Sequence, residues 1–192
     1  MSDTVVETER LVLRRWREGD LDQWIAHLNT PEVRAHLGGV VSPEKVAEKF
    51  ARVERGWADD GFSFLAVDRC EDGEFLGTCG IARIKTECAP PELKGAVQIG
   101  WQLRSDWWGQ GFATEAAEAV LAMAFDEFDL LAVYAQTSER NTASWRVMQR
   151  LGMTRRVDLD YDDPDYSPEE NPTMVYGMTR SEWQARQAGA GQ

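Results

Sequence analysis

The stretch Trp108-Gly109-Gln110-Gly111-Phe112-Ala113 stands between a strand-like run and a long amphipathic helix, and it decides the fold. Two glycines separated by one residue allow a tight curl, because glycine tolerates positive φ and lets a ligand approach the backbone closely. The curl leads into a helix expected over 114–128, whose first N–H groups are unpaired and carry partial positive charge. Such a loop is typical of a phosphate or pyrophosphate site. The alternative is a plain strand-to-helix turn.

Two familiar kinds of phosphate loop do not fit this stretch. A Walker loop requires Gly-Lys-Ser/Thr, which the chain lacks. A dinucleotide fingerprint requires a third glycine or alanine three positions after Gly111, where Thr114 stands. The loop also begins too late in the chain to leave room for a doubly wound domain after it. If the loop binds a phosphorylated ligand, it therefore does so in a fold other than these two.

Length, charge and cysteine content narrow the class of protein. The 192 residues are expected to form one domain over 1–187, followed by a disordered tail at 188–192. No apolar run approaches the roughly 20 residues that span a bilayer, so we expect no membrane partner and a cytoplasmic location. A net charge of −12 disfavours nucleic acid, whose phosphates require basic patches. The three cysteines lack metal-ligand spacing, so no metal is expected.

The hydrophobic pattern predicts strands and helices around one central sheet. Strands are expected over 10–16, 62–68, 75–84, 97–103, 131–136, 154–159 and 174–178. Helices are expected to begin at Asp20, Ser42 and Asn141 as caps, and to occupy 114–128. The order is one strand, two helices, three strands, a helix, a strand, a helix and two strands. It predicts an α/β or α+β layer fold with about seven strands.

Four segments in a fixed order carry a likeness to a known family. They are Thr8-Glu9-Arg10-Leu11-Val12-Leu13-Arg14; Ile99 to Leu103 with Trp107 to Ala116; Asn141 to Ser144 with Leu151-Gly152-Met153; and Val175 to Met178 with Glu182-Trp183. Together they resemble the GNAT superfamily of N-acetyltransferases, in the branch of the ribosomal-protein N-terminal acetylases. The resemblance covers nearly the whole chain. It implies a central mixed, mostly antiparallel sheet flanked by helices, in which the splayed parallel strands 97–103 and 131–136 hold acyl-CoA.

The resemblance implies acetyl-CoA as co-substrate, with no metal, and assigns its contacts. Backbone groups of Trp101, Gln102 and Leu103 would pair with the pantetheine arm like an added strand. Asn141 would bind pantetheine through its side chain, a role compatible with helix capping. The pyrophosphate would be held by the amides of the loop and the helix start, which are Trp108, Gly109, Gln110, Gly111, Phe112, Ala113 and Thr114.

The residues expected to assist the chemistry depart from the family pattern. Many relatives carry a tyrosine as general acid seven residues after Asn141, where this chain has Met148. Ser144, one turn earlier, is the usual substitute in this branch and would hydrogen-bond the CoA sulfur; the alternative is a packed or capping serine. His36 lies in a loop that faces the acceptor site in this branch. It is a candidate base near neutral pH, or else a surface or capping histidine.

Both positions where relatives often carry a basic glutamate hold glutamine, Gln98 and Gln136, which cannot take a proton. An α-amine with a pKa of about 8 is roughly a tenth neutral at pH 7, whereas a lysine amine at about 10.4 is neutral in fewer than about one molecule in a thousand. The absence of a base therefore favours direct attack by a low-pKa primary amine. The expected acceptor is the N-terminal α-amine of a protein or peptide.

Other functions stay open on the sequence alone. A small-molecule amine, such as an antibiotic or a polyamine, is an alternative acceptor. A non-catalytic acyl-CoA-binding module would also lack the base and the tyrosine. The sequence does not fix the length of the acyl chain. Dimers are common in this branch, so a homodimer is compatible with the resemblance.

Overall fold

The computed structural model describes residues 3–190 of the chain. The chain divides into two compact units. The first unit is Met1–Ala82 with Gly100–Val120, and the second unit is Arg83–Ile99 with Leu121–Gln192. No helix in the described part of the chain is long and apolar enough to cross a membrane.

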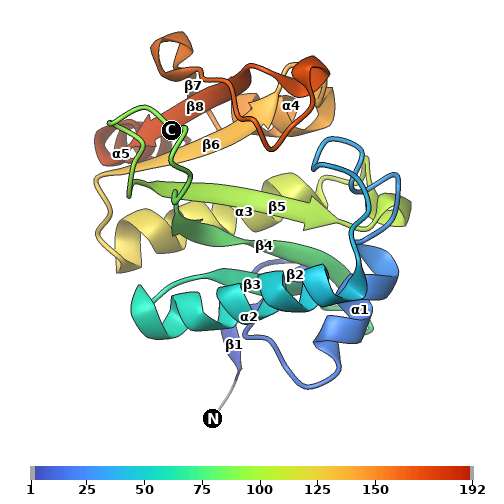
Figure 1. Cartoon of the computed structure of the whole chain (residues 1–192). Coiled ribbons are helices and arrows are strands. Elements are labelled where there is room, and N and C mark those ends of the chain that lie inside the picture. Colours follow the sequence, from blue (N-terminus) through green and yellow to red (C-terminus); the bar gives the residue numbers. More distant parts are fainter. Residues whose placement is uncertain (1–2, 191–192) are drawn as a thin grey trace. The chain divides into compact units, whose positions relative to one another are not determined.

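The first unit is built on antiparallel strands covered by two helices (Figure 1). Its strands, each hydrogen-bonded to the next, are β1 (Thr4–Glu7), β2 (Leu11–Arg14), β3 (Phe64–Arg69) and β4 (Phe75–Arg83). The helices are α1 (Asp20–His27) and α2 (Pro43–Asp59). Trp24 of α1 and Val46 of α2 are buried in one cluster with Ala66 of β3, so the apolar faces of both helices pack on the sheet.

The second unit contains the parallel strand pair. Strand β5 (Val97–Leu103) begins there and pairs in parallel with β6 (Ala132–Ser138), where Gln98 lies opposite Tyr134. Strand β6 pairs antiparallel with β8 (Thr173–Thr179), which pairs with the short β7 (Thr154–Arg155). The helices and helical turns of this unit are η2 (Met123–Glu127), α4 (Thr142–Arg150), η3 (Val157–Leu159), η4 (Pro168–Glu170) and α5 (Arg180–Ala190).

The expected fold class is confirmed: the sheet structure is mixed and mostly antiparallel, with helices beside it. The described residues form eight strands, one more than expected, because β1 adds to the edge of β2. Strands β3 and β4 form an antiparallel hairpin whose turn includes Gly73, with a φ of 73°. The parallel relation of the expected cofactor strands is confirmed at Gln98 and Tyr134.

Several expected boundaries are wrong. The strand expected over 10–16 is only Leu11–Arg14, and the helix expected over 114–128 begins at Phe112 as α3 (Phe112–Ala122) and continues as the π-helical η2. The strand expected over 154–159 ends at Arg155, where η3 follows. Asp20 is not a cap, because Gly19 takes the cap position with a φ of 90° and the Asp20 carboxylate binds the buried Arg14 instead.

Helix α5 was not expected. It follows β8 directly and stacks Trp183 on Phe125, with ring centroids 5.8 Å apart. Its backbone continues to Ala190, so it includes residues 188–190 of the expected tail; residues 191 and 192 lie outside the described residues. The boundaries of a single domain over 1–187 stay a prediction.

Candidate functional site

The glycine loop of the first unit forms the expected curl. After β5 ends at Leu103, the chain makes a 3-10 turn, η1 (Ser105–Trp107), and then passes Gly109 and Gly111 with φ values of 75° and 84°. The helical hydrogen bonds of α3 start with the Glu115 N–H, which donates to the Gly111 carbonyl over 3.1 Å. The N–H groups of the three residues before Glu115 therefore precede the helical ladder and have no helical partner. The Trp108 N–H, expected to hold pyrophosphate, instead donates to the Ser105 carbonyl over 3.3 Å. A Cβ atom at Gly109 would meet nothing within 4 Å, so a ligand can approach the backbone there.

Arg10, which immediately precedes β2, forms an ion pair with Glu115 that holds the glycine loop. The Arg10 Nε donates to Glu115 Oε2 over 2.7 Å, and Arg10 Nη1 donates to the Gln110 carbonyl over 3.0 Å. The guanidinium also lies 4.5 Å from the centre of the Phe112 ring. The Thr8 hydroxyl donates to the same carboxylate. We call Thr8, Arg10 and Glu115 the loop clamp; it joins the first two segments that carry the family likeness.

The ionised form of Glu115 is stabilised by its hydrogen-bond partners. Partial burial alone would raise the pKa of this carboxyl, but hydrogen bonds from Thr8 and Arg10 outweigh it and hold the pKa below its ordinary value. Glu115 is therefore ionised at neutral pH, and the clamp carries opposite charges at its centre.

The strand end that leads into the loop has most of its side chains engaged. The Gln102 amide donates to the Leu28 carbonyl at the end of α1 over 3.0 Å. Trp108 is half exposed, and its indole N–H donates to the Leu103 carbonyl over 2.9 Å. Trp107 packs edge-on against Phe112, with centroids 6.0 Å apart. The residues expected to contact pantetheine and pyrophosphate are thus held rigidly, and Trp101 is half-buried beside them.

In the second unit, the start of α4 presents two free polar groups. The Asn141 Oδ1 accepts the Ser144 N–H over 3.2 Å, which confirms Asn141 as the cap. Its amide Nδ2 and the Ser144 hydroxyl make no hydrogen bond within the described chain, and both side chains are half-buried. Met148, which stands at the tyrosine position of many relatives, is buried with 2% exposure. Asn141 and Ser144 therefore share one helix start and can act on one ligand, whereas Met148 belongs to the core.

The two glutamines at the expected base positions bind each other. The Gln136 Nε2 donates to Gln98 Oε1 over 2.8 Å, and the Tyr161 hydroxyl donates to Gln136 Oε1. We call Tyr161, Gln136 and Gln98 the amide chain. Burial raises the pKa of Tyr161, and the nearby carboxyl of Asp163 raises it further, so the phenol stays protonated and remains a donor. The amide chain contains no group that takes a proton at neutral pH.

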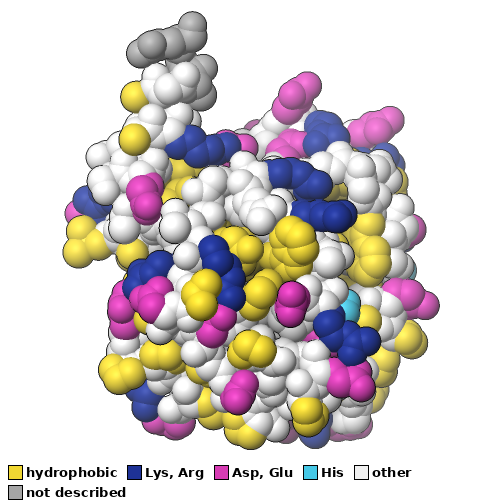
Figure 2. All heavy atoms as spheres, turned by 90° about the horizontal axis from the view of Figure 1, so that it is seen from above, with side chains coloured by type: hydrophobic (Ala, Val, Ile, Leu, Met, Phe, Trp, Pro, Cys, Tyr) yellow, Lys and Arg dark blue, Asp and Glu magenta, His cyan; other side chains and the backbone are white. Residues whose placement is uncertain are grey.

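Tyr161 belongs to the acidic loop, residues 160–172, which lies between η3 and β8. The Asn171 side chain fastens it: Oδ1 accepts the Asp163 N–H over 2.8 Å, and Nδ2 donates to the Asp163 carbonyl over 3.1 Å. Ser138, at the end of β6, hydrogen-bonds Glu170. Acidic and basic side chains are interspersed in Figure 2, where they form no large area of one sign. The exposed carboxylates of the acidic loop are Asp162, Asp165 and Glu169.

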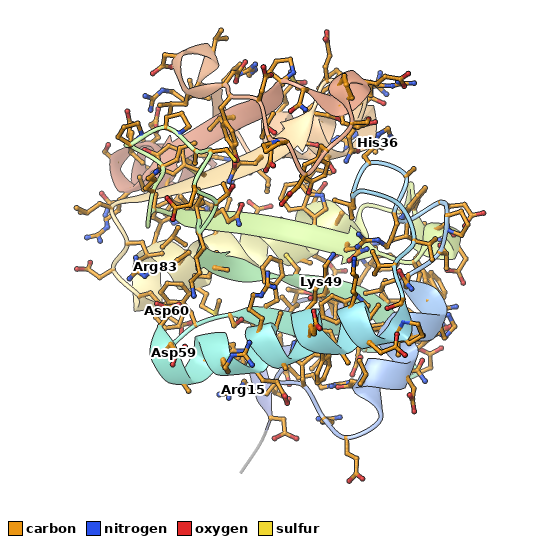
Figure 3. The ribbon with its side chains drawn as sticks, in the orientation of Figure 1. Arg15, His36, Lys49, Asp59, Asp60 and Arg83 are labelled. Atoms are coloured by element: carbon orange, nitrogen blue, oxygen red, sulfur yellow. The ribbon has the colours of Figure 1, made fainter. Side chains whose placement is uncertain are left out.

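The two candidate catalytic residues lie in different units. His36 is half-buried in the loop between α1 and α2 of the first unit (Figure 3). Ser144 is in the second unit. The role of each stays a separate prediction. The described residues hold no cluster of side chains that could bind a metal ion.

Comparison with known proteins places these features in one family. The family model for the acetyltransferase (GNAT) domain matches residues 10–154. The chain is 29% identical to the uncharacterized protein YkkB of Bacillus subtilis (strain 168) over 153 residues, which are 78% of this chain and 85% of that protein. It is 33% identical to the FsC-acetyl coenzyme A-N(2)-transacetylase of Aspergillus fumigatus over 115 residues, 58% of this chain and 48% of that protein.

A solved structure extends the likeness to three dimensions. The acetyltransferase from Agrobacterium tumefaciens str. C58 superposes with a TM-score of 0.73 at 26% identity, over 90% of this chain and 92% of that one. The span matched by the family model begins at Arg10 of the loop clamp and includes the glycine loop and α4. The chain therefore belongs to the GNAT acetyltransferases and is an N-acetyltransferase that takes its acetyl group from acetyl-CoA.

Proposed function

We propose that this enzyme acetylates the N-terminal α-amine of proteins or peptides by direct attack on acetyl-CoA. The hydrogen bond between Gln136 and Gln98 supports this acceptor most strongly. The two glutamines stand where relatives often carry a basic glutamate that deprotonates the amine, and neither amide can take a proton. An acceptor that is already partly neutral suits such a site.

Each set of candidate residues is proposed for one part of acetyl-CoA. In this proposal the open N–H groups at the start of α3 hold the pyrophosphate, and the loop clamp keeps them in place. Backbone groups of Trp101 to Leu103 pair with pantetheine, and the free amide of Asn141 binds it as well. The Ser144 hydroxyl hydrogen-bonds the departing sulfur. A thiol with an ordinary pKa of about 8.5 needs only modest help to leave as a thiolate.

The balance of the reaction favours an α-amine over a lysine. The amine lone pair forms a bond to the thioester carbon, the C–S bond breaks, and the amine gives its proton to water. The pKa difference of about 2.5 between the two amines corresponds to about 3.4 kcal/mol of extra activation for lysine at neutral pH. Positioning the α-amine beside the thioester then provides much of the acceleration.

The direct test compares two acceptors at pH 7: a tetrapeptide with a free N-terminus and no lysine, and Nα-acetyl-lysine. We expect kcat/KM for the tetrapeptide to exceed that for the lysine side chain by about 200- to 300-fold, the ratio of their neutral fractions. The rate on the peptide should rise with pH up to the pKa of its own amine. A faster reaction with Nα-acetyl-lysine would contradict the proposal.

A small-molecule amine is the second candidate acceptor. The exposed carboxylates of the acidic loop suit a polycationic amine, and the Aspergillus relative is named as an FsC-acetyl coenzyme A-N(2)-transacetylase. This function predicts saturation by a polyamine or an aminoglycoside at micromolar to millimolar concentration, together with no turnover of peptides. The same assay, run with those amines, separates the two functions.

A further inference from the structure

Tyr161 is fixed at both ends. Its backbone forms an antiparallel bridge with Thr173, in which the Thr173 N–H donates to the Tyr161 carbonyl over 2.8 Å. Its ring packs against the buried cluster that includes Leu159 and Val175. Its hydroxyl reaches Gln136, which is 25 residues away in the sequence. The position of the phenol is therefore set by the fold, and Gln136 must adapt to it.

The phenol favours one orientation of both amides. A phenol can donate or accept but is the stronger donor, and here the Tyr161 hydroxyl donates to the carbonyl oxygen of Gln136 while the Gln136 NH2 group faces Gln98. Gln98 in turn must present its own carbonyl oxygen to that donor. Without the hydroxyl, both amides can turn over together, because a reversed pair makes an equally good amide–amide hydrogen bond.

The far end of the amide chain is a free donor. The Gln98 Nε2 has no hydrogen-bond partner in residues 3–190, and it is not among the buried unpaired atoms of the chain. Gln98 lies opposite Tyr134 on the parallel strands, and Gln136 is two residues beyond Tyr134, so all three share one face. An NH2 group is thus presented on the face of β5 and β6 that carries the expected base positions.

We propose that Tyr161 is a positioning residue which, through Gln136, makes the Gln98 NH2 group a selector for acceptors with a carbonyl next to the amine. Peptide N-termini and amino-acid amides have this arrangement, and their carbonyl oxygen accepts from Gln98 while the amine attacks. A simple alkylamine offers no such acceptor. The inference rests on the proposed function and names the chemical group by which the α-amine is recognised.

The test uses Tyr161→Phe, which keeps the ring in its apolar cluster and removes only the hydroxyl. Native and variant enzymes are compared on three acceptors: alaninamide, tetra-alanine and propylamine. Each acceptor is compared with itself, so differences in amine pKa cancel. We expect kcat/KM to fall by about 5- to 10-fold for the two carbonyl-bearing acceptors and less than about 2-fold for propylamine, as the loss of one oriented hydrogen bond implies. KM for acetyl-CoA and the midpoint of thermal unfolding should stay unchanged.

A further variant sharpens this test. Gln98→Leu removes the NH2 group itself and should give the same selective loss. Equal losses on all three acceptors, or no loss, would overturn the inference while leaving the proposed function intact. A native enzyme that turns over propylamine but neither carbonyl-bearing acceptor would contradict the proposed function itself. Activity on alaninamide without activity on tetra-alanine would assign the selector to free amino-acid amides instead of peptides.

Discussion

The polar centres of the two units are built from opposite kinds of groups. In the first unit, Arg10 and Glu115 form a charged pair beneath the glycine loop, and Arg14 is buried between two carboxylates. In the second unit, the amide chain is neutral throughout. The first unit thus uses opposite charges to hold the backbone of its glycine loop. Under the proposed function, the second unit instead offers the amine two neutral amides, neither of which accepts its proton.

The largest effect is expected from removing the buried ion pairs of Arg14 in the first unit. Its Nη1 lies 2.6 Å from Asp20, its Nε binds Asp68, and all three side chains are buried. Arg14→Met would leave two buried carboxylates without a counter-charge, which costs about 3–5 kcal/mol of unfolding free energy. The loss of unfolding free energy is measured by urea unfolding of the native protein and the variant at pH 7.

The neighbouring Arg15 provides the matched control. Arg15 is exposed and lies beside α2 (Figure 3). Its guanidinium is 4.3 Å from the centre of the ring of Trp57, which belongs to α2. Arg15→Met should cost less than about 1 kcal/mol. Equal losses for the two variants would show that the buried ion pairs contribute nothing beyond a surface contact.

This Arg14 site marks one limit of prediction from sequence. Asp20 precedes an apolar helix face, which is the usual sign of a cap, and only the fold shows that its carboxylate lies beside Arg14. The short edge strand β1 was missed because its residues are half-buried and show no strong alternation. Helix α5 was missed because Trp183 is its one large apolar residue. In each case a tertiary contact decides what local pattern leaves open.

The glycine loop was the easier part to predict. Gly109 and Gly111 require positive φ values, which is a local property that the sequence states directly. Asn141 is likewise a local signal, and its cap is confirmed. Tyr161 carries no comparable signal, because its partner Gln136 is 25 residues away in the sequence. Local rules therefore predict the curl of the glycine loop and the cap but not the amide chain.

The second prediction concerns a charge introduced into the amide chain of the second unit. Gln136→Glu places a carboxylate where relatives often carry a base, and the Tyr161 hydroxyl would donate to it. We expect kcat/KM for Nα-acetyl-lysine at pH 7 to rise by about 10- to 100-fold, because a general base then accepts the proton. The gain should disappear as the pH falls through the pKa of the new carboxyl, which the phenol holds low.

The pH profile of this variant distinguishes base catalysis from a change in binding. Gln136→Leu serves as its control, since it also breaks the amide chain but adds no base. A gain that does not change with pH anywhere in the acidic range, or one that Gln136→Leu shares, would show that the carboxylate does not act as a base.

A third prediction weakens the loop clamp. Glu115→Gln keeps the shape of the side chain and removes its charge, so the ion pair with Arg10 is lost. We expect KM for acetyl-CoA to rise by about 5- to 10-fold with kcat at saturation unchanged, because the loop would no longer be held open for the pyrophosphate. Glu71→Gln, at a largely exposed carboxylate of the same unit, is the control.

The pH dependence of the clamp follows from the lowered pKa of Glu115. The ordinary value is 4.5, and its partners hold the folded value below that. The contribution of the carboxylate is therefore complete above pH 4.5 and is lost as the pH falls through the lowered value. The KM values of native enzyme and Glu115→Gln should converge only in that acidic range; convergence near pH 6 would contradict the role of the charge.

The smallest effect is expected at Ser144, and its size follows from the chemistry of the leaving group. The Ser144 hydroxyl is free in the described structure, so Ser144→Ala breaks no hydrogen bond of that side chain, and the Ser144 N–H still caps on Asn141. A CoA thiolate leaves without full protonation near its pKa of about 8.5, so one neutral hydrogen bond to sulfur is worth only about 2- to 5-fold in kcat at pH 7. The deficit should shrink for an acyl donor whose thiol has a lower pKa, because a better leaving group needs less help. A deficit of 100-fold or more that is independent of the leaving group would instead assign Ser144 to the acceptor side, where proton removal and not thiolate departure limits the rate.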